Sequence, residues 1–123
     1  MPKTKILYID DEDINLRIFK INLGTRFDVL TCNSGSCGLK LLEQHTDIPV
    51  VVTDMRMPNM NGSDFIRSAK LLHPSIAFFI LSGHDITDEI NHLIELGMVK
   101  KYFRKPFNLK GIGNDIEATI SES

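Results

Sequence analysis

Short apolar runs and helical stripes alternate along this chain from one end to the other. Five runs have the length and composition of strands: Lys5–Ile9, 27–31, Val50–Thr53, 77–81 and Lys101–Arg104. Between and after them, apolar residues recur every three or four positions, which predicts helices that pack through one face. These helices are expected over residues 14–23, 39–45, 65–73, 86–96 and 109–120.

The apolar stripes predict which helical faces are buried. In the first helix the stripe is Ile14, Ile18 and Ile21, widened by Phe19 and Leu23, and Gly24 is a plausible terminator. The other stripes are Leu39, Leu41 and Leu42; Phe65, Ile66, Ala69 and Leu72; Ile86, Ile90, Leu93 and Ile94; and Leu109, Ile112, Ile116 and Ile120. All of these positions are expected to face a core.

Strict alternation of strand and helix predicts an α/β fold of the (βα)5 type. Its five-stranded sheet would be parallel, doubly wound by right-handed crossovers and covered on both faces. The chain has 123 residues, 42% of them hydrophobic, which is enough for one domain with one real core. We therefore expect residues 1–123 to form a single domain.

The net charge and the hydrophobic content of the chain argue against nucleic acid and membrane as direct partners. The net charge is −2 and the pI is about 6.0, so the chain offers no electrostatic case for direct binding to nucleic acid. No apolar stretch approaches the roughly 20 residues that span a bilayer, and no signal peptide precedes the first strand. We expect no membrane segment and a cytoplasmic protein. The two cysteines, Cys32 and Cys37, are interpreted as small, half-buried thiols without redox chemistry.

Charged residues stand at the ends of three of the predicted strands. Asp10 and Asp11 follow the first, Asp54 follows the third, and Lys105 follows the fifth. The carboxyl ends of parallel strands share one edge of the sheet, where α/β folds bind ligands. Carboxylates that are brought together repel one another, and a divalent cation relieves that repulsion. The spacing predicts a pocket for such a cation and a phosphoryl group, with one ammonium beside it.

Two further features fit this pocket. Asp54 closes an apolar strand and opens a polar loop that contains Pro58 and Gly62, and a carboxylate placed there can act as a nucleophile on phosphorus. Ser82 follows the fourth predicted strand, so its hydroxyl could donate a hydrogen bond to a phosphoryl oxygen. Taken alone, each would be an ordinary loop residue.

These motifs together resemble the receiver domains of the bacterial two-component response regulators, over essentially the whole chain. The family's acidic pair matches Asp10 and Asp11, and its D-x-x-M-P-x-M-x-G string matches residues 54–62 in full. Its hydroxyl residue matches Ser82, and its K-P-F ending matches residues 105–107. The resemblance implies the flavodoxin-like strand order 2-1-3-4-5.

The resemblance also implies a function. A histidine kinase or histidine phosphotransfer protein would donate a phosphoryl group to Asp54, and Lys105 would contact that group. Mg²⁺ would be held by Asp11 and Asp54, by Asp10 through water, and by the backbone carbonyl of Arg56. Such a chain is a phosphoacceptor switch rather than an enzyme, with some autodephosphorylation, and it signals to an output domain or protein that the sequence does not identify.

Five positions concern the conformational switch and the lifetime of the phosphorylated state. By the same resemblance, Ser82 moves to hydrogen-bond the phosphoryl group and Tyr102 is the aromatic that turns inward, which reshapes the surface of the fourth helix, fifth strand and fifth helix. One residue more than usual separates Gly97 from Lys105, which leaves Tyr102 or Phe103 as the switch; Tyr102 is preferred. Arg56 and His84 are expected to tune hydrolysis of the aspartyl phosphate.

Three other functions compete with this one. Phosphatases with an aspartyl nucleophile carry D-x-D, whereas Arg56 stands where the second acid would be. A receiver-like interaction module that is never phosphorylated would be expected to have lost an acid or the lysine, and both are kept here. A flavodoxin would need a phosphate-cradling loop of Ser, Thr and Gly after the first strand, which is missing.

Overall fold

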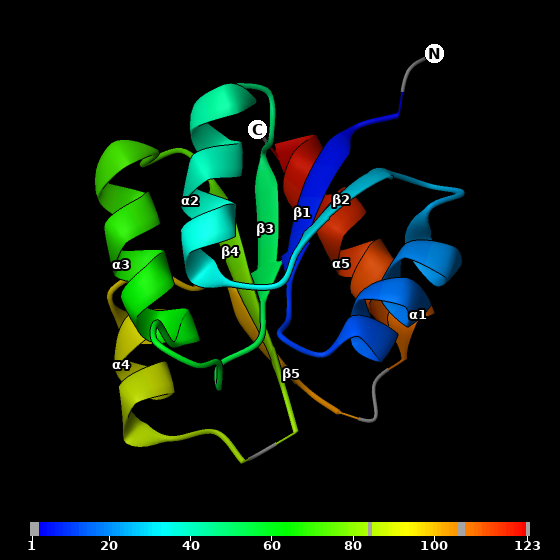
Figure 1. The fold of residues 1–123 in the computed structure, drawn as a ribbon. Helices are drawn as coiled ribbons and strands as arrows, with labels where there is room; N and C mark the ends of the chain where they lie inside the picture. The colour runs from blue at the N-terminus through cyan, green and yellow to red at the C-terminus, as the bar shows by residue number, and fades with distance from the viewer. Residues whose placement is uncertain (1–2, 84, 106–107, 123) are drawn as a thin grey trace.

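The computed structural model describes residues 3–83, 85–105 and 108–122. Strands and helices alternate along them, as the hydrophobic pattern predicts (Figure 1). Their bounds are β1 Lys5–Ile9, α1 Asp13–Leu23, β2 Asp28–Cys32, α2 Gly35–Gln44, β3 Val50–Thr53, α3 Gly62–Leu72, β4 Ala77–Ser82, α4 Asp88–Glu95, β5 Lys101–Arg104 and α5 Leu109–Glu122.

The five strands form one parallel sheet in the order β2-β1-β3-β4-β5. The predicted α/β class and the flavodoxin-like strand order are therefore confirmed. Helices α2, α3 and α4 cover one face of the sheet, and α1 and α5 cover the other (Figure 1). The order reverses between β1 and β3, so the pocket of a doubly wound fold is expected where these two strands end.

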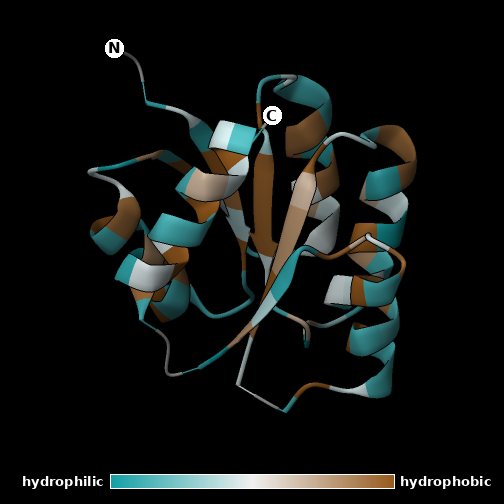
Figure 2. Cartoon of the chain, turned by 180° about the vertical axis from the view of Figure 1, so that it is seen from behind, coloured by the Kyte–Doolittle hydropathy of each residue, from teal (hydrophilic) through white to brown (hydrophobic). Residues whose placement is uncertain are grey.

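Side-chain alternation along the strands divides the interior into two cores. In β1, Leu7 and Ile9 point toward α2 and α3, whereas Ile6 and Tyr8 point toward α1 and α5. The same alternation in β3 buries every one of its residues. Hydrophobic residues accordingly predominate in the central strands, whereas the helices alternate hydrophobic and hydrophilic residues (Figure 2). A sheet buried on both faces explains why the strands read as continuous apolar runs.

The buried face of α1 is not the predicted one. Ile14, Ile18 and Ile21 are exposed by 59%, 41% and 75%, while Phe19 and Leu23 are buried as expected. Phe19 stacks on the Tyr8 ring at a centroid distance of 4.1 Å, and this contact sets the rotation of the helix. The sequence holds two stripes at helical spacing, and the isoleucines belong to the solvent-facing one.

Two apolar residues predicted to be buried are also exposed. Leu72, in the last turn of α3, is exposed, and Ile86 precedes α4 instead of forming its first turn. Helix α4 starts one residue after Thr87, because the Thr87 hydroxyl caps it by accepting a hydrogen bond from the backbone N–H of Ile90. The position of the capping residue, and not the apolar periodicity, therefore sets where α4 begins.

The cysteines are not two separate thiols. Cys32 ends β2 and Cys37 lies in the first turn of α2, with a Cα–Cα separation of 5.7 Å, and their sulfurs form a disulfide. The short turn 33–34 folds α2 back over the end of β2, which brings the two residues together. The earlier interpretation was wrong because spacing in the sequence does not reveal this approach.

Candidate functional site

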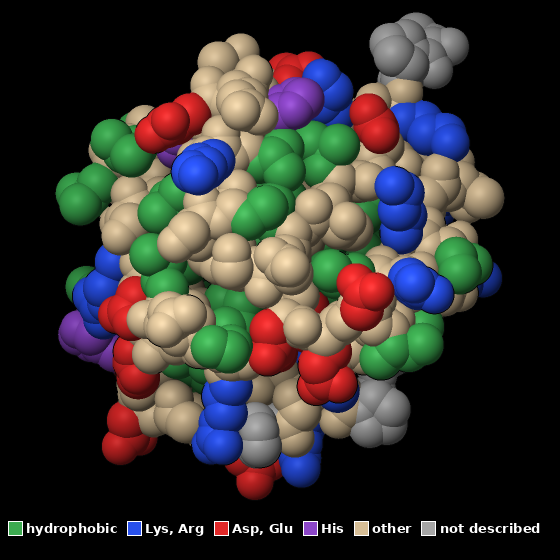
Figure 3. Space-filling view, viewed as in Figure 1, with side chains coloured by type: hydrophobic (Ala, Val, Ile, Leu, Met, Phe, Trp, Pro, Cys, Tyr) green, Lys and Arg blue, Asp and Glu red, His purple; other side chains and the backbone are tan. Residues whose placement is uncertain are grey.

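Hydrogen bonds in line with the sheet ladder place the charged residues at the strand ends. The backbone N–H of Asp10 donates to the Cys32 carbonyl at 3.1 Å, and that of Asp54 donates to the Ile9 carbonyl at 2.8 Å. The N–H of Lys105 donates to the Ser82 carbonyl at 2.7 Å. Each of these residues is therefore the first after its strand, and a hydrogen bond fixes its backbone. On the surface, acidic side chains gather on the lower half of the face seen in Figure 3.

Lys105 joins two of the acids. Its ammonium Nζ lies 2.9 Å from Asp10 Oδ2 and 3.7 Å from Asp54 Oδ2. The Asp10 side chain is fully buried, so this ion pair is shielded from water and is stronger than an exposed one. The predicted meeting of Asp10, Asp54 and Lys105 is what the structure contains.

The Asp10 carboxylate accepts three hydrogen bonds. Oδ2 accepts from the Tyr8 hydroxyl at 2.6 Å and from Lys105, and Oδ1 accepts from the backbone N–H of Glu12 at 3.0 Å. Sequence reasoning missed Tyr8, although a signal was present: two residues apart in a strand, Tyr8 and Asp10 share a face. Burial, together with Asp10, raises the pKa of Tyr8, so the phenol remains a neutral donor.

Replacing Tyr8 with phenylalanine is expected to lower the free energy of unfolding by about 2 kcal/mol, because a buried carboxylate loses a short hydrogen bond. Urea unfolding near neutral pH measures this. Tyr102→Phe is the matched control, since the Tyr102 hydroxyl is buried and has no well-formed hydrogen bond among the described residues. An equal loss in both variants would contradict the role given to Tyr8.

The phosphoacceptor candidate Asp54 is buried at the end of β3. Burial raises its pKa to about 6; the ammonium of Lys105 opposes that rise, and the charge of Asp10 adds to it. Its Oδ1 accepts a hydrogen bond from the backbone N–H of Met55 at 2.8 Å. Because burial removes water from this carboxylate, a cation that binds it, or an electrophile that it attacks, relieves the cost of its buried negative charge.

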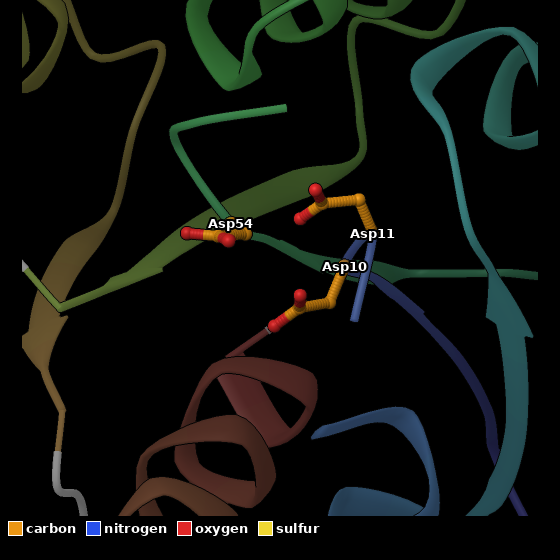
Figure 4. A group of neighbouring side chains, drawn as sticks. All are labelled: Asp10, Asp11 and Asp54. Carbon is orange, nitrogen blue, oxygen red and sulfur yellow. The ribbon is translucent and has the colours of Figure 1, made fainter. Parts of the chain in front are cut away.

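The three carboxylates can hold a metal ion. Oxygen atoms of Asp10, Asp11 and Asp54 all lie within 4.8 Å of one another. Asp11 extends from the segment after β1 toward Asp54, with Asp10 beside them (Figure 4). Among the described residues, Asp11 has no hydrogen bond, whereas the Asp10 carboxylate already accepts three hydrogen bonds. The donor set fits a hard cation such as Mg²⁺ on Asp11 and Asp54, with Asp10 better suited to contact through water.

A surface hollow of about 360 Å³ opens beside these acids. It is lined by Asp11, Glu12, Asn15, Asp54, Arg56, Gly83 and Lys105. Arg56 therefore borders the pocket, as predicted, and Glu12 borders it too. His84, the second predicted residue for lifetime tuning, and the Pro and Phe of the K-P-F ending lie outside the described residues.

The loop after Asp54 depends on one glycine. A Cβ atom on Gly62 would lie 2.5 Å from the Asp54 carbonyl oxygen, and the Gly62 N–H donates to the Met55 carbonyl at 2.8 Å. Asn59 adopts a positive φ of 69° at the tip. The loop thus folds back tightly on the residue that it follows, which explains the glycine of the motif.

Ser82 and Tyr102 lie on the neighbouring strands β4 and β5. Ser82 is buried at the end of β4, and Tyr102 pairs with Ile80 in β5. Burial raises the pKa of the Tyr102 phenol, and the nearby Ser82 side chain is among the groups that oppose the rise. Tyr102 packs on the core beneath α4, whereas Phe103 packs on the opposite core, 5.9 Å from the Phe79 ring.

Comparison with known proteins places these motifs in a family context. Residues 6–117 match the family described as "Response regulator receiver domain". A response regulator receiver domain protein from Clostridium thermocellum has a similar structure, with a TM-score of 0.90 and 35% identity, covering 97% of this chain and 95% of that one. A chemotaxis protein CheY homologue from Campylobacter jejuni is 29% identical over 121 residues, which are 94% of this chain and 92% of the relative.

Other relatives are much longer. The uncharacterized transcriptional regulatory protein YesN of Bacillus subtilis is 33% identical over 78 residues, which are 63% of this chain and 21% of that protein. The chain spans a similar share, 21%, of the hydrogenase regulator HoxA of Cupriavidus necator. Within the described residues, no helix is both long and apolar enough to span a membrane.

Proposed function

Because the chain belongs to the response regulator receiver domain family, we propose that Asp54 accepts a phosphoryl group from the phosphohistidine of a histidine kinase or histidine phosphotransfer protein. The observation that carries the proposal is the position of Asp54: buried, with a raised pKa, beside an ammonium and two further carboxylates. One Asp54 oxygen attacks phosphorus, the phosphorus–nitrogen bond breaks, and its electron pair leaves with the imidazole.

The residues around Asp54 support this transfer. Lys105 lies 3.7 Å from Asp54 and would offset charge on the incoming group, and Ser82, at the end of β4, would donate its hydroxyl to a phosphoryl oxygen. Bound Mg²⁺ would neutralise phosphoryl oxygens that the acids would otherwise repel. We assign it to Asp11, Asp54 and the backbone carbonyl of Arg56, with Asp10 contacting it through water.

The proposed output is a change at the α4-β5-α5 surface. A dianion on Asp54 would draw Ser82 toward it, and Tyr102 would follow, because its ring lies on the α4 side of β5 and near the Ser82 side chain. The position of Phe103 on the opposite core favours Tyr102 as the switch. The chain thus acts as a phosphoacceptor switch, not as a conventional enzyme, and its output partner is unassigned.

The exposed isoleucines of α1 provide a docking surface for the phosphodonor. Ile14, Ile18 and Ile21 face solvent on the helix whose start borders the pocket through Glu12 and Asn15. A donor protein seated on this apolar stripe would bring its phosphohistidine within reach of Asp54. We also propose that residues 1–123 form one receiver domain that acts in the cytoplasm, where histidine kinases expose their phosphohistidine.

Incubation with acetyl phosphate and Mg²⁺, followed by intact-mass measurement, tests the proposal. The parent protein should gain the mass of one phosphoryl group, and Asp54→Asn should gain none. Asp13→Asn is the matched control, because Asp13 is an exposed acid of α1 that pairs with Arg17 outside the pocket. No gain in the parent protein, or a gain in Asp54→Asn, would refute the assignment.

Arg56 is expected to set how long the phosphorylated state lasts. It is exposed and borders the pocket two residues beyond Asp54, where a long polar side chain can shield or position the attacking water. Arg56→Ala should change the rate of dephosphorylation severalfold, a barrier change of about 1 kcal/mol. The corresponding expectation holds for His84→Ala. Decay of the phosphorylated protein, followed by mass, measures both, and unchanged rates would remove the idea.

A further inference from the structure

The disulfide between Cys32 and Cys37 lies at the same sheet edge as the phosphoacceptor pocket. Cys32 is the last residue of β2 and pairs in register with Ile9, the residue before Asp10. These two are the only cysteines of the chain, and the fold brings their Cα atoms to 5.7 Å, inside the usual range for a disulfide. Nothing in the proposed phosphoryl transfer uses them.

The two sulfur-bearing residues differ in access to solvent. Cys32 is buried within the core under α2 and α3. Cys37 is half-buried and borders a surface hollow of about 450 Å³, together with Lys40 and Ser34. An external thiol can therefore reach Cys37, while Cys32 is shielded as the resolving partner.

The surroundings of Cys37 favour thiol chemistry. It lies in the first turn of α2, where its backbone N–H donates to the Ser34 hydroxyl at 3.1 Å and no acidic residue is present. Lys40 adds a positive charge one turn further along the same hollow. A helix start and a neighbouring ammonium both stabilise a thiolate, which is the form that attacks or leaves in disulfide exchange.

We infer that Cys32 and Cys37 form a reversible redox site for a dithiol–disulfide partner, and that its redox state regulates the phosphoacceptor pocket. The regulatory half of this inference rests on the proposed function. In reducing compartments, a disulfide that forms at all is usually transient and redox-sensing, which suits an accessible pair of this kind.

The exchange is balanced in atoms and electrons. A thiolate of the reducing dithiol attacks Cys37 Sγ, the bond between the two cysteines breaks, and Cys32 leaves as a thiolate that takes up a proton. The second thiol of the reductant then attacks the mixed disulfide and releases Cys37. Two electrons pass to the protein and the dithiol becomes a disulfide; oxidation is the reverse.

Two contacts connect this pair to the pocket. The Cys32 carbonyl accepts the hydrogen bond that holds the backbone of Asp10, next to the metal-binding acids. On the other side, the first turn of α2 abuts the loop that follows Asp54: a Cβ on Gly35 would lie 2.6 Å from the Met60 sulfur. The disulfide ties the end of β2 to that turn, so it restrains both contacts at once.

The oxidised form should therefore hold a better-ordered pocket. We expect Mg²⁺ to bind about threefold more tightly to the oxidised protein than to the reduced one, because less ordering is left to occur on binding. The rate of Asp54 phosphorylation by acetyl phosphate at limiting Mg²⁺ should differ by a similar factor. Without metal, the amide resonances of Asp10 and Met60 should shift between the two states.

Titration of the full chain with mixtures of reduced and oxidised dithiothreitol tests the site itself. Thiol labelling and intact mass should show one reversible two-electron transition, and the double variant Cys32→Ala, Cys37→Ala should show none. Calorimetry with Mg²⁺ and amide spectra are then compared between the redox states of the parent protein. The double variant should give the same Mg²⁺ affinity under both conditions.

The outcomes separate the two proposals. Failure of the disulfide to form, or identical Mg²⁺ affinity and amide spectra in both states, overturns the redox inference. A redox-dependent shift at Asp10 and Met60 with no phosphorylation of Asp54 in either state supports the redox site and its structural coupling, refutes the phosphoacceptor function, and thereby overturns the regulation of phosphorylation.

Discussion

Replacing Lys105 with methionine is expected to lower the free energy of unfolding by about 3 kcal/mol near neutral pH. The Lys105 ammonium lies 2.9 Å from the fully buried Asp10 carboxylate and 3.7 Å from Asp54. Methionine keeps most of the side-chain volume, so the loss reports mainly the charge. The Tyr8 hydroxyl and the Glu12 N–H still donate hydrogen bonds to Asp10. The expected loss of stability is therefore at the lower end of the range for removing one partner of a buried ion pair.

The loss should depend on pH in a defined direction. Once Asp54 is protonated, below its pKa of about 6, one of the two carboxylates no longer needs the ammonium, and the cost of the substitution shrinks. Urea unfolding in the absence of metal, from about pH 4 to about pH 7, measures this. Phosphorylation by acetyl phosphate should also fall in the variant, since an opposing positive charge is gone.

Lys101→Met is the matched control. Lys101 also pairs with an acid, Asp115, at 3.1 Å, but these side chains are 54% and 39% exposed, so water screens the pair. An exposed ion pair contributes less than about 1 kcal/mol, so this variant should lose little stability. Equal losses in Lys105→Met and Lys101→Met would mean that Lys105 has no special electrostatic role in the pocket.

Replacing Asp54 with asparagine should have the opposite effect and raise the free energy of unfolding near neutral pH by roughly 2–3 kcal/mol without metal. The pKa of Asp54 is about 6 in the folded protein and 3.8 as the model value for the unfolded chain. The folded state thus binds the proton more tightly. That contribution to stability is fully present below the unfolded pKa and is lost as pH rises through about 6.

The gain from Asp54→Asn should therefore vanish near pH 4 and be complete near pH 7. Added Mg²⁺ should stabilise the parent protein and leave the variant unchanged, because a ligand that binds only the folded state adds to its stability. Asp13→Asn, at an exposed position, should show neither effect. A variant no more stable than the parent protein at neutral pH would show that Asp54 is not held in an unfavourable, desolvated site.

Most of the fold could be predicted because the hydrophobic periodicity of a strand or a helix can be recognised from neighbouring residues in the sequence. Residues 6–9 and 50–52 are apolar throughout, and a sheet buried on both faces is the structure in which such runs are stable. Placing charged residues at the strand ends then predicted the pocket, since parallel strands bring those ends together. The face of α1 could not be chosen in this way, because its two apolar stripes have the same period and only packing against the core, such as the Phe19 ring on Tyr8, distinguishes them.

The sequence by itself determined the parallel α/β architecture and the meeting of Asp10, Asp54 and Lys105, because both follow from periodicity and from where each strand stops. Only the tertiary structure decided that Tyr8 and Lys105 share one Asp10 oxygen, that Cys32 lies against Cys37, and that the α1 isoleucines face solvent. These features depend on distances between segments and on helix rotation. Packing sets them, and only the spacing of Tyr8 and Asp10, two residues apart on one face, gave a local signal.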